Sequence, residues 1–500
     1  MMSAARRTCG RPRRCARAIA ALLAAALLDG CMLGPDFVRP APPQADRYTQ
    51  EPLAATIAAD GQAQQFAPGA ALPADWWRLF GSAPMNGVVE QALARNPTLQ
   101  SAEASLRQSQ DNLRAGYGIF FPSLDAGLSA TRMRSAPQQQ GSTNEATVFN
   151  VVTASGVISY PLDWFGGERR AVEGLAAQVD LQRNAGRAAY LTLSANVVDA
   201  CIARAAYAAQ LRATEQLIAL ETEQLRSVEA QVDAGTTPYA AILSQQALIA
   251  GNQAQLAALR QKISQAEHLL ALLMGSLPEQ AALPDIALDS LALPATLPLS
   301  LPSELVRQRP DILQAEARLH AASADIGVAT AAMFPSLSLS ATYGSAGSKP
   351  GNFLAAGNRF WGVGPALAMP LFHGGSLWYG RQAAIDAYRQ QEANYRQTVL
   401  QAFGQVADAL NALQHDAQAL QAQRDARNAA AGALQLLQAN YRAGLVAYLD
   451  VLSADIQLHG ADIAYLQAVA QRQQDTVALL AALGGGWWSA AAGAGEGAAP

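Results

Sequence analysis

Apolar and polar residues alternate with a period of two in four short segments of the chain. The segments cover residues 124–131, 152–160, 337–343 and 361–369, and small polar residues fill most of the alternate positions. This pattern suits strands with lipid on one face and water on the other. A half-buried sheet in a soluble protein alternates in the same way, so the pattern alone predicts strands but not their surroundings. Aromatic residues cluster near the strand ends, as interfacial girdles do: Phe120, Phe121, Tyr160, Trp164, Phe360 and Trp361.

Most of the remaining chain has the pattern and composition of long helices. Residues 168–233 contain no proline and are rich in Ala, Gln, Leu, Glu and Arg, which favour helix, and residues 377–442 are their counterpart. Apolar residues in the second segment step by four and three, as in a coiled-coil seam: Val399, Phe403, Val406, Leu410, Leu413, Ala417 and Leu420. A helix of roughly 65 residues is about 100 Å long.

Shorter helical segments flank the long ones. Residues near 239–274 and 85–117 predict helices of about 54 Å and about 50 Å, so two short helices end to end match one long helix. We therefore expect a tall antiparallel layer in which each long helix packs against a stacked pair. The Ala-rich and Gln-rich faces fit either a water-filled interior or an ordinary soluble bundle, and composition does not separate the two.

The chain is a tandem internal repeat. Pro97, Phe121 and Pro122 recur 213 residues later as Pro310, Phe334 and Pro335. Matches after that point are offset by 209 residues instead, as in the pairs Pro161 and Pro370, and Gly235 and Gly444. A long duplicated unit implies a pseudo-symmetric molecule in which both halves do the same structural work. Enzymes with one asymmetric site rarely have this organisation.

The first thirty residues have the features of a bacterial export signal. Six arginines precede an apolar run at residues 18–28, which is too short to span a bilayer. The run ends in LLDGC, so Gly30-Cys31 resembles a lipoprotein cleavage point at which Cys31 becomes the acylated N-terminus. Asp29 replaces the small residue usual before the glycine, and an ordinary signal peptide is the alternative. Met32 follows Cys31, and the absence of Asp there favours outer-membrane delivery.

Charge and cysteine content exclude other classes. Removing residues 1–30 takes away six arginines and one aspartate, which leaves 29 basic and 38 acidic residues and a net charge of −9. No basic stripe remains for a nucleic acid. After loss of the signal and acylation of Cys31, only Cys201 remains, so no disulfide framework is possible. Cys201 lies in an apolar helical segment, where a buried small hydrophobe is expected rather than a nucleophile.

The residues after position 30 contain no apolar run of about eighteen residues, so no transmembrane helix is expected. An outer-membrane protein without such helices crosses the bilayer as a closed β-barrel. Four strands do not close a barrel, so the chain must act as an oligomer. Dimers, trimers and tetramers all remain open on this argument.

Three segments carry a family resemblance. CMLGPDFVRP follows the lipobox, DWWRLFG spans Asp75 to Gly81, and LPSELVRQRPDILQAEARLHAASADIGVATAAMFPSLSLSATYG spans residues 301–344. With these segments the chain resembles the TolC-like outer-membrane factor family, in its acylated NodT/OprM branch, from Cys31 to about Gly484. The GSAPM stretch departs from the Asp-Pro that is more usual in this branch.

The resemblance implies an α+β fold and a homotrimer. Four strands per chain would build a twelve-stranded outer-membrane barrel, continued by a long antiparallel helical tunnel in the periplasm. The implied partners are a periplasmic adaptor protein, an inner-membrane resistance-nodulation-division transporter and outer-membrane lipid. The predicted organisation is a signal peptide (1–30), an extended N-terminal segment (31–84), two repeats (85–277 and 303–484) joined by a linker (278–302), and a disordered tail (485–500).

No catalytic constellation, cofactor motif or metal motif is visible. The five histidines are scattered, and the HExxH, GxxxxGK and GxSxG motifs are absent. FHGGS at 372–376 is only superficially similar to an oxyanion loop, because its repeat partner is WFGGE at 164–168 and both are typical of strand-to-helix turns. We therefore expect no enzyme and no cofactor.

The candidate sites are the two turns that join long and short helices. Gly235 and Gly444 suit the left-handed conformation that ends a helix, which explains both glycines structurally. Leu445 and Val446 are apolar at a hairpin tip, which suggests a docking surface. The resemblance implies that these tips, Thr236 among them, meet the adaptor and close the tunnel.

The resemblance also places a periplasmic gate just beyond the second tip. Asp450 follows Gly444 by six residues, where relatives carry a carboxylate that forms a constriction ring around the trimer axis. Leu449 and Ser453 would contribute to the same ring, which is less acidic because relatives often have a second Asp at the Ser453 position. The alternative for Asp450 is a solvated carboxylate on a helix surface.

Three functions fit these observations. The first is the outer-membrane channel of a tripartite efflux pump for small molecules or drugs. The second is the same duct in a type I protein or peptide secretion system, and the third is a lipid-anchored coiled-coil scaffold. The lipobox and the GPDF segment favour the first.

Overall fold

The computed structural model describes residues 32–51, 54–135, 146–349, 351 and 354–489. It divides into two compact units. The strand unit comprises residues 1–39, 108–180 and 317–393, and the hairpin unit comprises residues 40–107, 181–316 and 394–500.

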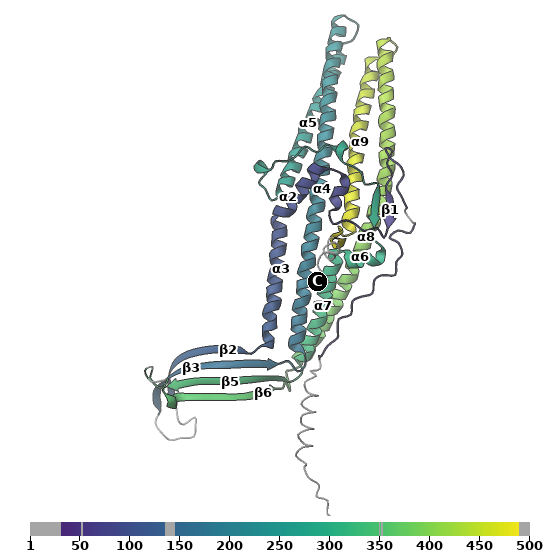
Figure 1. The fold of residues 1–500 in the computed structure, drawn as a ribbon. Helices are drawn as coiled ribbons and strands as arrows, with labels where there is room; N and C mark the ends of the chain where they lie inside the picture. The colour runs from purple at the N-terminus through teal and green to yellow at the C-terminus, as the bar shows by residue number, and fades with distance from the viewer. Residues whose placement is uncertain (1–31, 52–53, 136–145, 350, 352–353, 490–500) are drawn as a thin grey trace, which may run out of the picture. The chain divides into compact units, whose positions relative to one another are not determined.

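The strand unit contains one antiparallel sheet of four strands. They are β2 (Ser123–Ser135), β3 (Thr147–Leu162), β5 (Ser336–Gly347) and β6 (Arg359–Ala368), and they lie in the order β2-β3-β5-β6 (Figure 1). β2 and β6 each pair with a single neighbour within the described part of the chain. All four predicted strand segments are therefore strands, and the sheet has two edges.

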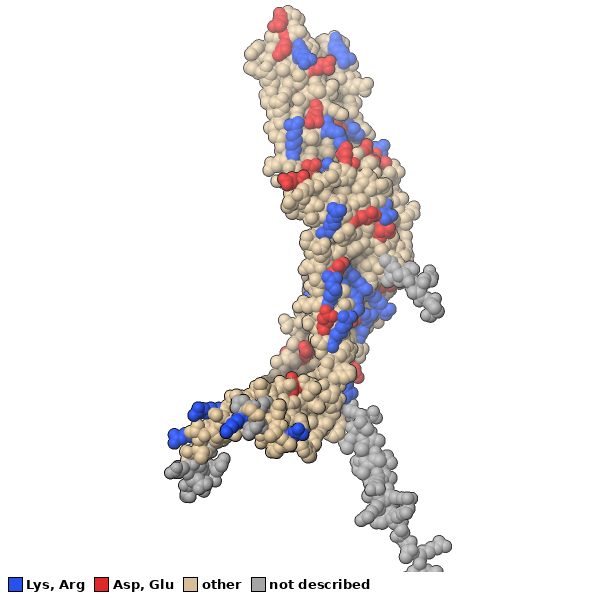
Figure 2. Space-filling model, turned by 60° about the vertical axis from the view of Figure 1, so that its left-hand side comes forward, with Lys and Arg blue, Asp and Glu red and all other residues tan. Residues whose placement is uncertain are grey.

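The register brings the apolar alternation of all four strands onto one face. Leu124 pairs with Ile158, Ile158 with Ala341, and Ala341 with Val363, which forms one row across the sheet. Leu124 is 73% exposed and Val363 is 65% exposed, so this face is apolar and uncovered in the single chain. β3 and β5 contain no charged residue. Figure 2 likewise shows few Asp or Glu side chains over the strands on the face it presents.

The helices follow the same order in both repeats, with a long helix and a returning helix after each strand pair. They are α2 (Ala83–Arg95), α3 (Pro97–Gly116), α4 (Gly167–Asp233), α5 (Ala240–Leu273), α6 (Pro302–Gln308), α7 (Pro310–Ala331), α8 (Ser376–Arg442) and α9 (Tyr448–Ala482). α4 and α8 each have 67 residues. The predicted seam of α8 is buried at Val399, Val406 and Leu413. No helix among the described residues is long and apolar enough to cross a membrane.

The helix predicted over residues 85–117 is two helices instead. Asn96 takes an extended conformation (φ −64°, ψ 124°) because the proline that follows disfavours the helical region. The Asn96 side chain makes two hydrogen bonds at this break in the helix. It accepts one from the Thr98 N–H (2.8 Å) and donates one to the Leu273 carbonyl (2.8 Å). The second repeat breaks in the same way at Arg309, before Pro310. Pro97 was visible in the sequence, and its consequence was missed.

The N-terminal segment and the linker meet in a small parallel sheet of the hairpin unit. β1 (Gln65–Pro68) pairs with β4 (Thr296–Leu299), and neither strand was predicted. The main core lies beside this sheet, with Trp76, Phe80 and Val197 fully buried.

The tail was predicted to be disordered from residue 485, but residues 485–489 form a turn and the start of a helix. Trp487 donates its indole N–H to the Gln308 carbonyl (2.8 Å), and the Arg187 guanidinium lies 3.5 Å from the centre of its ring. Residues 490–500 lie outside the described residues.

Candidate functional site

Both hairpin turns end their long helix in the same hydrogen-bonded motif. The Gly235 N–H donates to the Val232 carbonyl (2.9 Å), and the next N–H, that of Thr236, reaches back to Gln231 (2.9 Å). Gly444 (φ +72°) and Leu445 repeat these bonds at the end of α8. This Schellman arrangement needs a left-handed residue, which glycine adopts without steric cost. The glycines are thus explained by helix termination.

The predicted docking residues lie at these turns with different exposure. Leu445 is 74% exposed, whereas Val446 is half-buried. Thr236 is exposed, and its hydroxyl donates to the Gln231 carbonyl (2.9 Å). The uncovered apolar surface at the second tip is therefore mainly that of Leu445.

The predicted gate residues occupy the first turns of α9. Leu449 is 64% exposed, and Asp450 and Ser453 are also exposed. The Asp450 carboxylate accepts the Ala447 N–H (3.0 Å), so it caps the helix N-terminus as well as presenting a charge. The Ser453 hydroxyl donates to the Leu449 carbonyl (2.9 Å). A gate at these residues remains a prediction, since a single chain does not show an axis.

Two tyrosines join the hairpins, and sequence reasoning missed them. The Tyr441 hydroxyl on α8 donates to the Gln231 side chain on α4, and the Tyr448 hydroxyl on α9 donates to Gln245 on α5 (2.8 Å). The two rings lie 5.6 Å apart. In Figure 1 the α4–α5 and α8–α9 hairpins run side by side, and these contacts fasten them near their turns. The only feature of the sequence that could have indicated these contacts is the position of an amphipathic tyrosine close to a helix end.

Two buried carboxyl groups lie between the same hairpins, a little further from the turns. Glu221 on α4 is 1% exposed, and Asp455 on α9 is 5% exposed. Burial raises the pKa of both carboxyl groups, and the charge of Asp455 raises the pKa of Glu221 further, against the hydrogen bond from Asn252, which lowers it. Neither residue was singled out from the sequence.

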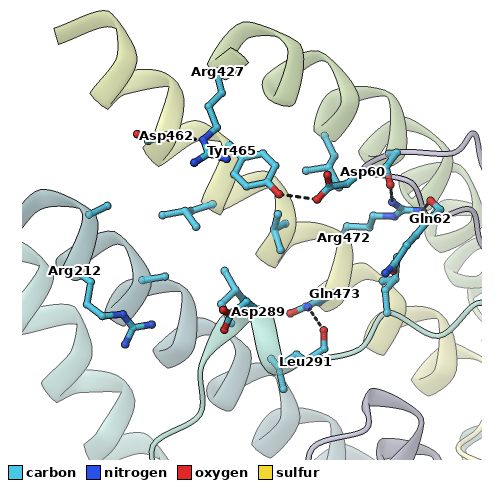
Figure 3. Close-up of a pocket in the computed structure, with 18 of the residues that line it drawn as sticks. Asp60, Gln62, Arg212, Asp289, Leu291, Arg427, Asp462, Tyr465, Arg472 and Gln473 are labelled. Atoms are coloured by element: carbon cyan, nitrogen blue, oxygen red, sulfur yellow. Dashed lines mark hydrogen bonds and ion pairs between the residues drawn. The ribbon is translucent and has the colours of Figure 1, made fainter. Parts of the chain in front are cut away.

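A cavity of about 540 Å³ separates the hairpins nearer the core of this unit. Figure 3 shows Arg212 of α4 on one side, Tyr465 and Gln473 of α9 on the other, and Asp289 of the linker below. The Gln473 side chain donates to the Leu291 carbonyl (3.2 Å). The cavity wall is thus built from both repeats and the linker.

Residues 54–68, here called the N-terminal strap, are fastened beside this cavity by one buried arginine. Arg472 is 1% exposed, and its guanidinium donates to Thr56 Oγ1 (3.2 Å), Gln64 Oε1 (3.2 Å) and the carbonyls of Ala59 (3.4 Å) and Gln62 (3.2 Å). All four acceptors are neutral, and all belong to the strap. Arg472 therefore links α9 to the N-terminal segment of the chain.

In the strand unit, a second buried arginine holds the residues that follow the predicted lipidation site. Arg170 is 1% exposed and contacts the carboxylates of Asp36 and Glu173 (2.7 Å each). The N–H of Leu33 donates to the Phe165 carbonyl (3.1 Å). Cys31 itself lies outside the described residues.

The described residues contain no group of three or more His, Cys, Asp or Glu side chains arranged to hold a metal ion. Cys201 is 1% exposed, and burial raises its pKa to about 12, which suits an inert core residue rather than a nucleophile. Gly374 and Gly375, of the FHGGS segment, have positive φ in the turn between β6 and α8.

A family model described as "Outer membrane efflux protein" matches residues 88–276 and again residues 301–485. The chain belongs to this family. Its two matched segments also correspond to the two copies of the internal repeat.

Individual relatives match over nearly the whole length. The toluene efflux pump outer membrane protein TtgC of Pseudomonas putida is 30% identical over 446 residues, covering 88% of this chain and 89% of that protein. The cation efflux system protein CusC of Escherichia coli is 30% identical, covering 90% and 95%. Among solved structures, that of the outer-membrane channel OprN has a TM-score of 0.82 at 28% identity, covering 91% of this chain and all of that one.

Family membership confirms the resemblance to outer-membrane factors and the predicted class of function. The protein is an outer-membrane component of an efflux system, and its fold is that of the outer-membrane efflux channels. Efflux is favoured over protein secretion, because the matched relatives are named as efflux proteins. The family consists of channel proteins rather than enzymes.

Proposed function

We propose that three copies of this chain form the exit duct of a tripartite efflux pump. Each copy contributes four strands to one twelve-stranded barrel and two helical hairpins to one periplasmic tunnel. The duct conducts small molecules that an inner-membrane resistance-nodulation-division transporter and a periplasmic adaptor deliver. It performs no chemistry on them.

The sheet is the observation that supports this assembly. Its four strands present one continuous apolar face, and its two edge strands keep unpaired backbone groups. Open edges are not stable in lipid, because each unpaired N–H or C=O costs several kcal/mol there. Pairing β6 of one copy with β2 of the next satisfies both edges. The number three rests on the family resemblance.

The hairpin turns support the adaptor role. Leu445 is a large apolar side chain that is mostly exposed at a turn, where a single chain gives it nothing to pack against. We infer that an apolar surface of the adaptor covers it, with Gly235, Thr236, Gly444 and Val446 forming the rest of the docking surface. Leu449, Asp450 and Ser453 then line the closed gate behind it.

Small molecules as cargo fit the names of the relatives, which refer to toluene and to cations. A duct that serves such different cargoes makes few specific contacts, so selection occurs in the inner-membrane transporter. The lipid on Cys31 would anchor the assembly from the periplasmic side of the outer membrane, and the Arg170 contacts hold the chain that follows it.

The assembly is tested with protein extracted from outer membranes in mild detergent. We expect an unheated sample to migrate as a trimer and a boiled sample as a 52.4 kDa chain, less the signal peptide. Migration as a monomer without heating, or recovery in the soluble fraction, would count against the barrel.

The docking surface is tested by Leu445→Asp combined with Val446→Asp in an efflux-deficient host. We expect efflux to be lost while trimer migration is unchanged, because the charges disturb only the adaptor contact. Leu445→Met is the matched control, since it keeps an apolar side chain of similar volume and should retain efflux. Normal efflux by the double Asp variant at normal expression would remove these residues from the docking surface.

A further inference from the structure

The pair formed by Glu221 and Asp455 is unusual in how its oxygens are used. Glu221 Oε1 accepts a hydrogen bond from the Asn252 amide (2.7 Å), whereas Glu221 Oε2 and Asp455 Oδ2 are buried without a hydrogen-bond partner. Buried polar atoms normally find a partner, and an unpaired buried carboxylate is among the most costly groups. A cation or a proton would compensate these two oxygens.

In the described part of the chain, no Lys or Arg side chain supplies a compensating positive charge. Asn252 on α5 bonds the Glu221 carboxylate, Gln245 on α5 bonds its backbone carbonyl, and Tyr448 on α9 lies near both carboxyl groups. Within the described residues, no Lys or Arg is paired with either carboxyl group. His459, one helical turn beyond Asp455 on α9, is half-buried with an unpartnered Nε2, and burial lowers its pKa, which disfavours a positive charge there.

Protons are the remaining means of neutralising the pair. Both pKa values are raised by burial, and the raised pKa of Glu221 contains a contribution from the negative charge of Asp455. With both groups ionised, two like charges lie buried, and no Lys or Arg among the described residues pairs with either of them. With one or both protonated, the repulsion disappears, and each protonated carboxyl gains a donor.

The position of the pair makes this repulsion act between the hairpins. Glu221 belongs to the α4–α5 hairpin and Asp455 to the α8–α9 hairpin. The Gln245 amide connects them further, because it donates to the Glu221 carbonyl (3.0 Å) while its oxygen accepts the Tyr448 hydroxyl (2.8 Å). A force that separates the carboxyl groups therefore pulls on the tyrosine contacts nearer the turns.

We propose that Glu221 and Asp455 form a proton-operated latch that holds the two hairpins of each chain together when protonated and loosens when both carboxyl groups ionise. The sign follows from the direction of the two shifts. A carboxyl group with a raised pKa in the closed arrangement favours that arrangement at low pH. This contribution is fully present below the pKa of the exposed group and is lost as pH rises through the raised value.

The latch is tested by measuring the distance between the hairpin turns. Spin labels on Thr236→Cys and Leu445→Cys report this distance by pulsed electron resonance in purified protein that also carries Cys9→Ser, Cys15→Ser and Cys31→Ser. Cys201 is buried and escapes labelling. We expect longer or broader distances at pH 8 than at pH 5. For each pH unit by which the pKa of a carboxyl group in the closed arrangement exceeds its pKa in the open one, the ratio of closed to open molecules should change about tenfold.

Two neutral isosteres distinguish the latch from a general effect of pH. Glu221→Gln and Asp455→Asn should each keep the short distance at pH 8, and either variant suffices if the other folds poorly by circular dichroism. Glu223→Gln is the matched control, since Glu223 lies on the same helix but is exposed, and it should respond to pH as the unmodified chain does. An unchanged distance between pH 5 and 8, or an unaltered pH response in both isosteres, would overturn the latch. Neither measurement requires the adaptor, the transporter or efflux.

Discussion

Replacing Arg472 by Met should release the N-terminal strap from α9 without unfolding the helices. Methionine keeps much of the length and apolar volume of the arginine stem, so the packing of the helix should survive. The change removes the guanidinium, and with it the donors to Thr56, Ala59, Gln62 and Gln64. Gln64 would retain its bond to Thr476 (3.1 Å).

The expected magnitude follows from opposing effects. A hydrogen bond from a charged donor contributes about 1.5–3 kcal/mol, and here four such contacts are lost together. Removing the buried guanidinium also removes its desolvation cost, which offsets part of the loss. We therefore expect the strap to lose about 2–3 kcal/mol, rather than the sum of the four bonds.

Hydrogen exchange detected by mass spectrometry measures this loss locally. The amides of Thr56 and Phe66 are bonded to the Gln64 and Ala54 carbonyls (2.9 and 3.0 Å), so they exchange only when the strap opens. A loss of about 2–3 kcal/mol should accelerate their exchange about 30-fold to 150-fold, since about 1.4 kcal/mol corresponds to tenfold. Peptides from α9 should exchange at the unmodified rate.

Arg424→Met provides the comparison. Arg424 also contacts the strap, through Asp60 (3.2 Å), but both side chains are about 40% exposed. A solvent-exposed ion pair contributes about 0–1 kcal/mol, so exchange should rise about fivefold at most. Equal effects of the two substitutions, or faster exchange throughout α9, would show that Arg472 does not act as a local fastener of the strap.

Other expectations concern the anchor, the gate and pH. Cys31→Ser should abolish palmitate labelling but leave trimer migration unchanged; if the unmodified chain takes up no palmitate, the anchor is refuted. In planar-bilayer recordings, Leu449→Ala should raise conductance and Asp450→Ala should weaken cation preference, while Asp450→Asn separates charge from capping because an amide still accepts a hydrogen bond. The gate lies elsewhere if none of them changes conductance or selectivity. Burial, reinforced by Asp475, raises the pKa of Asp199 and Asp416 to about 7 each, so the unfolded chain loses these protons at lower pH than the folded chain does. The thermal midpoint should therefore fall as pH rises from about 4 to about 7, and Asn at either position should reduce that fall.

The sequence predicted those parts of the fold that depend on local periodicity. The alternation around Leu124 and the seam through Val406 each repeat over many residues, so one misplaced residue does not hide the pattern. The turn glycines were equally predictable, because residues other than glycine rarely adopt the left-handed conformation that these turns require. The pairing of β1 with β4 could not be predicted, since strands of four residues are too short to show a clear alternation of apolar and polar residues.

The contacts between hairpins were unpredictable for a different reason. Glu221 and Asp455 lie far apart in the chain, and each is an ordinary acidic residue within a helical segment. Their burial results from the packing of two helices, which no local pattern encodes. The same holds for Arg472, whose partners are about 400 residues away.

The matched lengths of α4 and α8 limit how this protein can be resized. Both helices have 67 residues, and the returning helices α5 and α9 have 34 and 35. Inserting one heptad into α4 alone would displace its turn by about 10 Å relative to the turn of α8, and the Tyr441 contact with Gln231 would be lost. A longer or shorter relative therefore has to change all four helices in concert. An engineer who wishes to span a wider periplasm should insert equal heptads into α4, α5, α8 and α9, at the same level in each.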